Sequence, residues 1–301
     1  MPVSTSRYEL LERRLGRFTR MLHDAATYDV RGLHRTRVAS RRLRELLPVL
    51  QLDGKVAGDL GRRLRKITQR LGKVRELDVC LLLIESLQAT GRYDKESLTV
   101  VVAALAHERA IARERLVTKV PLRELRRVGT KLNKLAGELE DVDETSRDNR
   151  RGRALRWAVD ARVHRRGAAL KAAIEHAGAV YLPDRLHKVR IALKKFRYAV
   201  ELASETSKEP RIAAQLRLLK RNQDLLGDWH DRQVLLDRVR QLQASLTPPD
   251  VVVWRGLASV ARMIENDCRR LHARYVRQCG ALVEICDRLI ARQPAAARRA
   301  G

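Results

Sequence analysis

Residues 33–50 read LHRTRVASRRLRELLPVL, and residues 186–203 read LHKVRIALKKFRYAVELA. Laid over each other, the two stretches carry basic side chains at the same points, which pair His34 with His187, Arg37 with Arg190, Arg41 with Lys194, Arg42 with Lys195 and Arg44 with Arg197. A second pair of segments follows at nearly the same offset: LGKVRELDVCLL from Leu71 and LGDWHDRQVLLD from Leu226. Two paired segments in the same order predict an internal duplication.

Nearly every other segment has the periodicity of a helix, with apolar residues at every third or fourth position and no stretch that alternates as a strand does. Proline residues mark the expected ends and starts of these helices. Pro48 should end or kink the helix that begins near Arg31, and helix starts are expected at Pro121, Pro183, Pro210 and the pair Pro248–Pro249. The expected helices are 7–26, 31–51, 55–71, 73–90, 97–119, 121–140, 147–178, 182–205, 210–227, 229–245, 250–277 and 279–292.

The predicted fold is therefore all-α, with two helical bundles related by a pseudo-twofold axis and packed into one unit. The polar stretch 141–149 separates the two expected repeats, about 7–140 and 147–292. Together they form one domain over residues 7–292, and residues 293–301 are expected to be a disordered tail.

The basic residues of both repeats follow a helical spacing. At roughly 100° per residue, His34, Arg37, Arg41 and Arg44 (the first ladder) fall within an arc of about 80°. Leu43, Leu46, Leu47 and Leu50 lie opposite and form the expected core stripe. His187, Arg190, Lys194 and Arg197 form the second ladder. Neither ladder contains an acid, and like charges one turn apart repel, so both ladders predict a polyanionic partner.

Further cations accompany the ladders in the next helix of each repeat: Arg62, Arg65 and Lys66 in the first, and Arg217, Lys220 and Arg221 in the second. Four arginines near acidic residues are candidate extensions of the same surface: Arg109, Arg113, Arg262 and Arg270. Four carboxylates after the two Leu-Gly pairs are expected to cap helix starts instead of catalysing a reaction: Glu76, Asp78, Asp228 and Asp231.

Composition points the same way. The 301 residues include 63 Lys and Arg against 36 Asp and Glu, which gives a net charge of +27. Aromatic residues make up 4%, too few for serial base stacking. The four cysteines have no zinc-ligand spacing and are expected to be reduced, and neither a metal nor a cofactor is predicted. No apolar leader or bilayer-length apolar stretch is present, so a cytoplasmic location is expected.

The duplicated pattern resembles the conserved histidine α-helical domain (CHAD) family. The resemblance rests on His34-x-x-Arg37-x-x-x-Arg41-Arg42-x-Arg44 and on its second copy from His187, and the paired Leu-Gly segments are similar to the family's second signature. It implies two four-helix bundles with a basic central groove or cavity that binds inorganic polyphosphate, and association with polyphosphate granules in some members. Phe196 replaces a leucine-like residue of the family pattern, which leaves room for unequal contributions from the two halves.

The expected function is non-catalytic binding of inorganic polyphosphate. The cations of the two ladders would neutralise successive phosphates, and His34 and His187 would donate hydrogen bonds. The first alternative is a protein that binds RNA or DNA, which the net charge alone would fit, although no nucleic-acid motif is visible. The second alternative is a phosphohydrolase acting on phosphate chains, which would need a metal-holding acidic cluster facing the cations.

Overall fold

The computed structural model describes residues 6–25, 30–119, 122–144, 149–206, 210–247 and 250–291. Within these ranges the chain is helical and contains no strand, which confirms the all-α prediction. The helices are α1 (Arg7–Ala25), α2 (Val30–Leu46), the short 3-10 helix η1 (Leu47–Val49), α3 (Gly54–Gln88), α4 (Lys95–Lys119), α5 (Leu122–Glu144), α6 (Asn149–Ala177), α7 (Pro183–Thr206), α8 (Pro210–Ala244) and α9 (Val251–Ile290).

Three of the predicted helix breaks are wrong, because α3, α8 and α9 run without interruption through positions 72, 228 and 278. An interior glycine such as Gly72 or Gly227 costs about 1 kcal/mol relative to alanine. Burial of the large apolar residues on either side, such as Leu71 and Leu226, stabilises the helix by more, at about 1.5–3 kcal/mol for each side chain. The glycines therefore lie inside long helices.

The four carboxylates expected at helix starts consequently lie in helix interiors, so the capping prediction for Glu76, Asp78, Asp228 and Asp231 is also wrong. The observed caps are other aspartates. Asp53 accepts hydrogen bonds from the first turn of α3, and Asp250 does the same for α9.

Proline marks the helix ends as expected where the structure describes it. Pro48 lies in η1, directly after α2 ends, and Pro183 and Pro210 are the first residues of α7 and α8. Pro121, Pro248 and Pro249 lie outside the described residues, as does the predicted tail over 293–301. The polar stretch 141–149 is partly helical, because α5 continues to Glu144 and Asp143 accepts a hydrogen bond from the Arg7 guanidinium at 2.6 Å.

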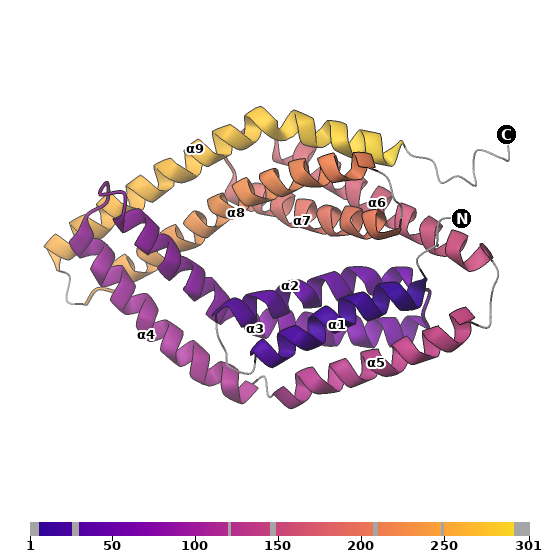
Figure 1. The fold of residues 1–301 in the computed structure, drawn as a ribbon. Coiled ribbons are helices and arrows are strands. Elements are labelled where there is room, and N and C mark those ends of the chain that lie inside the picture. Colours follow the sequence, from indigo (N-terminus) through magenta and orange to yellow (C-terminus); the bar gives the residue numbers. More distant parts are fainter. Residues whose placement is uncertain are drawn as a thin grey trace.

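The helices form two groups that face each other (Figure 1). In the first group α1 packs against α2 and α5, and α3 packs against α2, α4 and α5. In the second group α6, α7, α8 and α9 each pack against two neighbours, so that they close a four-helix ring. The groups touch where α2 meets α7, α3 meets α8 and α4 meets α9. The internal duplication and its pseudo-twofold axis stay predictions from the sequence.

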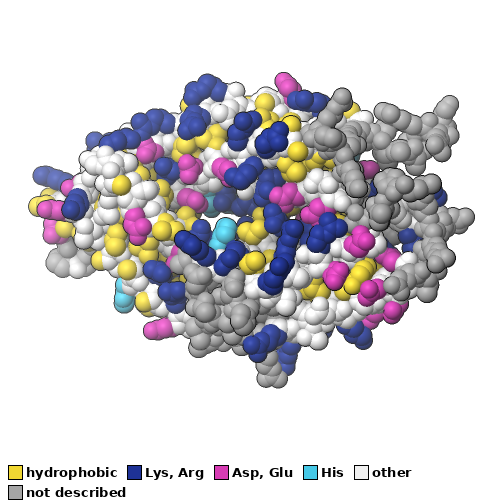
Figure 2. Space-filling view, in the orientation of Figure 1, with side chains coloured by type: hydrophobic (Ala, Val, Ile, Leu, Met, Phe, Trp, Pro, Cys, Tyr) yellow, Lys and Arg dark blue, Asp and Glu magenta, His cyan; other side chains and the backbone are white. Residues whose placement is uncertain are grey.

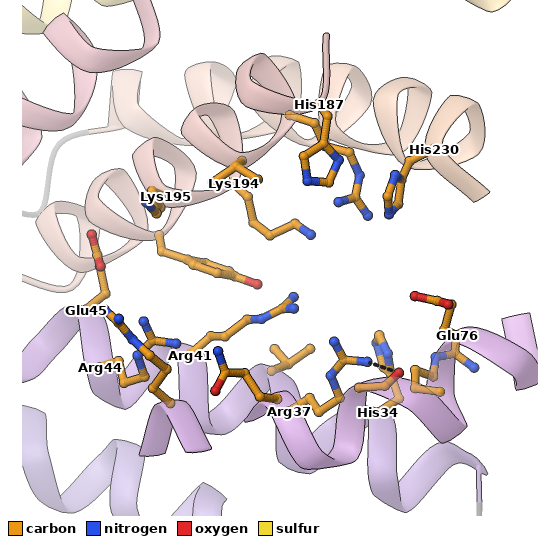
Figure 3. A pocket seen from close by; sticks show the side chains of 18 of the residues that line it. His34, Arg37, Arg41, Arg44, Glu45, Glu76, His187, Lys194, Lys195 and His230 are labelled. Atoms are coloured by element: carbon orange, nitrogen blue, oxygen red, sulfur yellow. Dashed lines mark hydrogen bonds between the residues drawn. The ribbon is translucent and has the colours of Figure 1, made fainter. Parts of the chain in front are cut away.

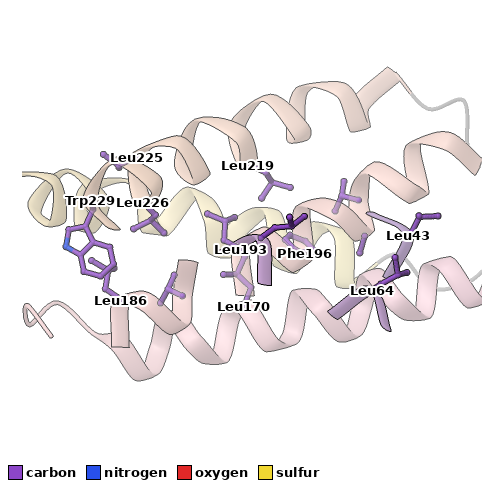
Figure 4. Close-up of a cluster of buried hydrophobic side chains, with 14 of the residues drawn as sticks. Leu43, Leu64, Leu170, Leu186, Leu193, Phe196, Leu219, Leu225, Leu226 and Trp229 are labelled. Atoms are coloured by element: carbon purple, nitrogen blue, oxygen red, sulfur yellow. The ribbon is translucent and has the colours of Figure 1, made fainter. Parts of the chain in front are cut away.

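Buried leucines set the orientation of both ladders. The expected stripe of Leu43, Leu46, Leu47 and Leu50 is at most 2% exposed, so the opposite face of α2 points away from the core. In the second group Leu193 and Phe196 of α7 are buried beside Leu219 of α8 and Leu170 of α6 (Figure 4). Burial of one such side chain contributes about 1.5–3 kcal/mol. The core thus holds α2 and α7 with their basic faces toward the space between the groups.

Candidate functional site

A cavity of about 1170 Å³ lies between the two groups of helices. We call it the central cavity. Residues of α2 and α3 line one side, and residues of α6, α7 and α8 line the other. Figure 2 shows Lys and Arg side chains gathered around a hollow near the middle of the molecule. The hollow therefore lies between two walls that come from different halves of the chain.

Most of the predicted ladder residues line this cavity. The predicted site residues in its lining are His34, Arg37, Arg41, Arg44, Arg62, Arg65, His187, Arg190, Lys194 and Lys195. Figure 3 shows Arg37 and Arg41 reaching up from α2, and His187 and Lys194 reaching down from α7. The spacing of three and four residues places each ladder on one face of its helix, opposite the buried leucines.

Six predicted site residues lie outside the cavity lining: Arg42, Lys66, Arg197, Arg217, Lys220 and Arg221. Ion pairing accounts for three of them. Glu201 of α7 binds Arg197 through an ion pair one turn away, and Arg42 Nε lies 3.3 Å from the same carboxylate. Lys220 Nζ lies 2.6 Å from Asp224. Lys66, Arg217 and Arg221 are exposed elsewhere on α3 and α8.

The four candidate extensions also lie outside the central cavity. Arg109 forms an ion pair with the buried Asp78, at 2.8 Å between Nε and Oδ1, and Arg270 forms one with Asp267. Arg113 and Arg262 are not part of the lining either. Arg270 thus pairs with an acid close to it in the sequence, whereas the partner of Arg109 comes from α3.

Several titratable residues of the lining were not predicted as site residues from the sequence: Glu45, Lys73, Arg75, Glu76, Arg162, Arg166, His230, Asp231 and Arg238. A signal existed for those on α3. Once this helix is continuous, Arg62, Arg65, Gln69, Gly72 and Glu76 follow one another at three or four residues and share a face. The expected break near residue 72 concealed that face.

Two lining carboxylates are held by arginines from the other half of the chain. Glu45 of α2 accepts hydrogen bonds from Arg162 at 2.9 Å and from Arg166 at 2.7 Å, both on α6. Burial alone would raise the pKa of Glu45, but these hydrogen bonds hold it below its ordinary value. At the α3 wall, Glu76 accepts a hydrogen bond from Arg238 of α8 at 3.0 Å. Both pairs tie the two walls of the cavity together.

Eight other cations of the lining have no acidic partner within the described ranges. Arg37, Arg41, Arg44, Arg65, Arg75, Arg190, Lys194 and Lys195 form no ion pair within the described ranges. The Nε atoms of Arg37 and Arg190 are buried and have no hydrogen-bond partner there. Burial and the neighbouring Arg41 and Arg75 lower the pKa of Arg37 to about 10. A dense cluster of like charges in a partly buried space attracts anions strongly.

Lys194 is the most perturbed of these cations. Burial, together with the charges of Arg190, Arg41 and Arg37, lowers its pKa to about 6. Asp231 is the carboxylate that opposes this shift, and its own pKa is raised by burial. The amine is therefore mostly neutral at pH 7 in the unliganded protein, and an incoming anion would favour its charged form.

Three imidazoles lie at one end of the cavity. The rings of His187 and His230 are 4.9 Å apart, and His34 faces them from α2 (Figure 3). Burial and the surrounding cations lower the pKa of all three, in His230 to about 3. Neutral imidazoles each keep one N–H donor, so they can donate a hydrogen bond to an anion without adding charge repulsion.

No group of three or more His, Cys, Asp or Glu residues in the described part of the chain is arranged to hold a metal ion. Cys80 lines the central cavity, and burial raises the pKa of its thiol to about 12. The donors that face the cavity are therefore guanidinium, ammonium and imidazole groups, which suit the oxygen atoms of phosphate or carboxylate.

Among the described residues, no helix is both long and apolar enough to cross a membrane.

The fold and the site define an all-helical protein with a cation-lined cavity between two groups of helices. The family model described as CHAD domain matches residues 9–240, so the chain belongs to the CHAD family. This confirms the family resemblance of the two ladders.

Two solved structures share the fold. The crystal structure of the CHAD domain from the plant Ricinus communis is 20% identical, with a TM-score of 0.63, and the match covers 98% of this chain and 95% of that one. PptA from Streptomyces chartreusis is 18% identical, with a TM-score of 0.59 and a coverage of 94% and 96%. No curated protein matches the chain.

Proposed function

We propose that the protein binds inorganic polyphosphate in the central cavity and does not catalyse its breakdown. One observation carries this proposal: cations of α2 and α3 and cations of α7 face one cavity that is open to solvent, and many of them have no ion pair within the described residues. Linear polyphosphate presents an anion at every repeat, so successive phosphates can each take a cation from either wall. Release of counterions then supplies much of the driving force.

The lining favours phosphate over nucleic acid. Tyr198 is the one Phe, Tyr or Trp residue in the described cavity lining, and it is 5% exposed. Single-stranded nucleic acid is usually bound by several aromatic side chains that stack on its bases. A chain of phosphates without bases needs only the guanidinium, ammonium and imidazole donors that are present.

A competition experiment tests the choice of ligand. Long-chain polyphosphate and single-stranded RNA are titrated against the protein at the same salt concentration, with Arg41→Glu as the cavity variant and Arg262→Glu as the exposed control. We expect polyphosphate to displace RNA, and the cavity variant alone to lose affinity. Preferential binding of RNA, or equal losses in both variants, would contradict the proposal.

A second measurement tests the absence of turnover. The protein is incubated with long-chain polyphosphate and magnesium, and released phosphate is measured over time. We expect no release above the rate without protein. Release that is lost in Arg41→Glu and kept in Arg262→Glu would instead establish a phosphohydrolase. Binding of this kind would place the protein on polyphosphate granules in the cytoplasm, which imaging of a fluorescent fusion can check.

A further inference from the structure

A second cavity adjoins the first. This side cavity, of about 630 Å³, lies between α2, α3 and α4. Its lining consists of Arg31, His34, Arg35, Arg75, Asp78, Leu81, Leu82, Glu85 and Arg109. His34 and Arg75 also line the central cavity. The two cavities therefore meet at these two side chains, at the imidazole end of the central cavity.

The side cavity is basic as well. Its cations are Arg31, Arg35, Arg75 and Arg109, and its acids are Asp78 and Glu85. The Asp78 side chain is only 1% exposed, and its Oδ1 lies 2.8 Å from Arg109 Nε. This pair fixes one guanidinium against the wall and neutralises it. Arginines therefore outnumber carboxylates in this lining by four to two.

Basic residues of α2 line the two cavities in succession. From Arg31 to Arg44 the helix rises about 20 Å, at 1.5 Å per residue. Basic side chains at Arg31, Arg35, Arg41 and Arg44 line one cavity or the other along this length. A ligand made of one repeated anion can follow this row of basic side chains, whereas a compact anion occupies only part of it.

We propose that a long polyphosphate chain leaves the central cavity between His34 and Arg75 and continues into the side cavity, which makes the protein prefer long chains to short ones. This inference rests on the proposed function. Tripolyphosphate fits within the central cavity alone and needs none of the arginines that line only the side cavity.

The test removes the two exposed arginines of the side cavity. Arg31→Ala/Arg35→Ala is compared with Arg255→Ala/Arg262→Ala, which removes the same charge from the exposed face of α9. We expect the first variant to lose about tenfold in affinity for long-chain polyphosphate, to lower the salt slope by about 0.7–0.9 per lost contact, and to bind tripolyphosphate as the wild type does. The control should change neither affinity by more than about twofold.

A steric variant tests the path without changing charge. Leu82 lines the side cavity and is 52% exposed, so Leu82→Trp should narrow the cavity without disturbing the core. Long-chain affinity should fall and tripolyphosphate affinity should not. If long-chain affinity stays at the wild-type value in both variants, or both chain lengths weaken equally, the side cavity is not part of the path. If the wild type binds neither chain length, the proposed function itself fails.

Discussion

The two ladders are alike in sequence but unequal in structure. All four residues of the first ladder line the central cavity, whereas the second contributes His187, Arg190 and Lys194 but not Arg197. The residue one turn after each ladder explains the difference. Pro48 follows Arg44 at that distance and ends α2, while Glu201 follows Arg197 and binds its guanidinium. A repeated pattern therefore keeps its helix face but not the partners of each side chain.

The neighbouring helices differ in the same way. On α3 the lining extends from Ala57 to Cys80, but on α8 it is confined to residues from His230 to Arg238. Arg162 and Arg166 of α6 complete this wall, and Glu45 binds both of them. The first half thus supplies most of the cations without an ion pair, and the second half supplies most of the paired ones.

The largest expected effect comes from removing one ladder at a time. Replacing Arg37, Arg41 and Arg44 by alanine should lower the affinity for long-chain polyphosphate by at least about 100-fold, because three charge-assisted contacts are lost. Replacing Arg190, Lys194 and Arg197 should cost about tenfold less, because Arg197 is outside the lining. Calorimetry measures both affinities, and circular dichroism checks that each variant keeps its helicity. Equal losses would show that the two ladders contribute equally despite Glu201.

The second prediction concerns Lys194, the counterpart of Arg41. Because its pKa falls from 10.5 to about 6 on folding, the unfolded chain binds a proton on this amine that the folded protein does not, and the unliganded protein loses stability progressively as pH drops from 10.5 to about 6. Lys194→Met should therefore raise the melting temperature at pH 7, with the difference vanishing near pH 10.5, and should weaken polyphosphate binding.

The same group couples binding to protons. Bound phosphate offsets the repulsion from Arg190, Arg41 and Arg37 and raises the pKa of Lys194, so the amine binds a proton with the ligand. The affinity for polyphosphate should therefore rise as pH falls from 8 toward about 6. Calorimetry in two buffers of different ionisation enthalpy should detect proton uptake by the wild type and less uptake by Lys194→Met. Uptake of equal size in both proteins would assign the effect to the imidazoles or to the ligand.

The leucine stripe and the ladder faces could be predicted because both depend only on the helical period of α2 and α7. Arg75 and His230 were not predicted as site residues because each follows a glycine at which a helix break was expected. The sequence alone does not show whether burial of the neighbouring residues stabilises the helix enough to continue past that glycine. Arg162 and Arg166 could not be predicted at all, since their place depends on how the two groups pack. The ion pair between Arg197 and Glu201 could have been predicted from the sequence, because the two residues are four positions apart on one helix.

A smaller effect is expected from breaking the ion pair between Arg197 and Glu201. Glu201→Gln keeps the shape of the side chain but removes the charge that binds Arg197 and Arg42. The affinity for polyphosphate should rise a few-fold, and stability should fall by about 1–3 kcal/mol. Urea unfolding and calorimetry measure the two changes. A loss of affinity would mean that Glu201 supports the cavity instead of withholding a cation from it.

The smallest effect is expected at Arg42, which differs in its surroundings from its counterpart Lys195. Arg42 lies outside the lining and is paired with Glu201, whereas Lys195 lines the cavity. Arg42→Ala should change the affinity by less than about twofold, and Lys195→Ala should lower it about fivefold. The reverse order would place the ligand beside Arg42, outside the central cavity.

The central claim is that both ladders serve one ligand in one cavity. Calorimetric titration with polyphosphate of a single defined length tests it most directly, with the wild type, Arg41→Glu and Lys194→Glu at the same salt concentration. The account predicts one chain bound per protein molecule in all three, with a lower affinity in both variants. Two chains bound per wild-type molecule, with each variant losing one of them and keeping the other at full affinity, would show two independent sites and contradict the account.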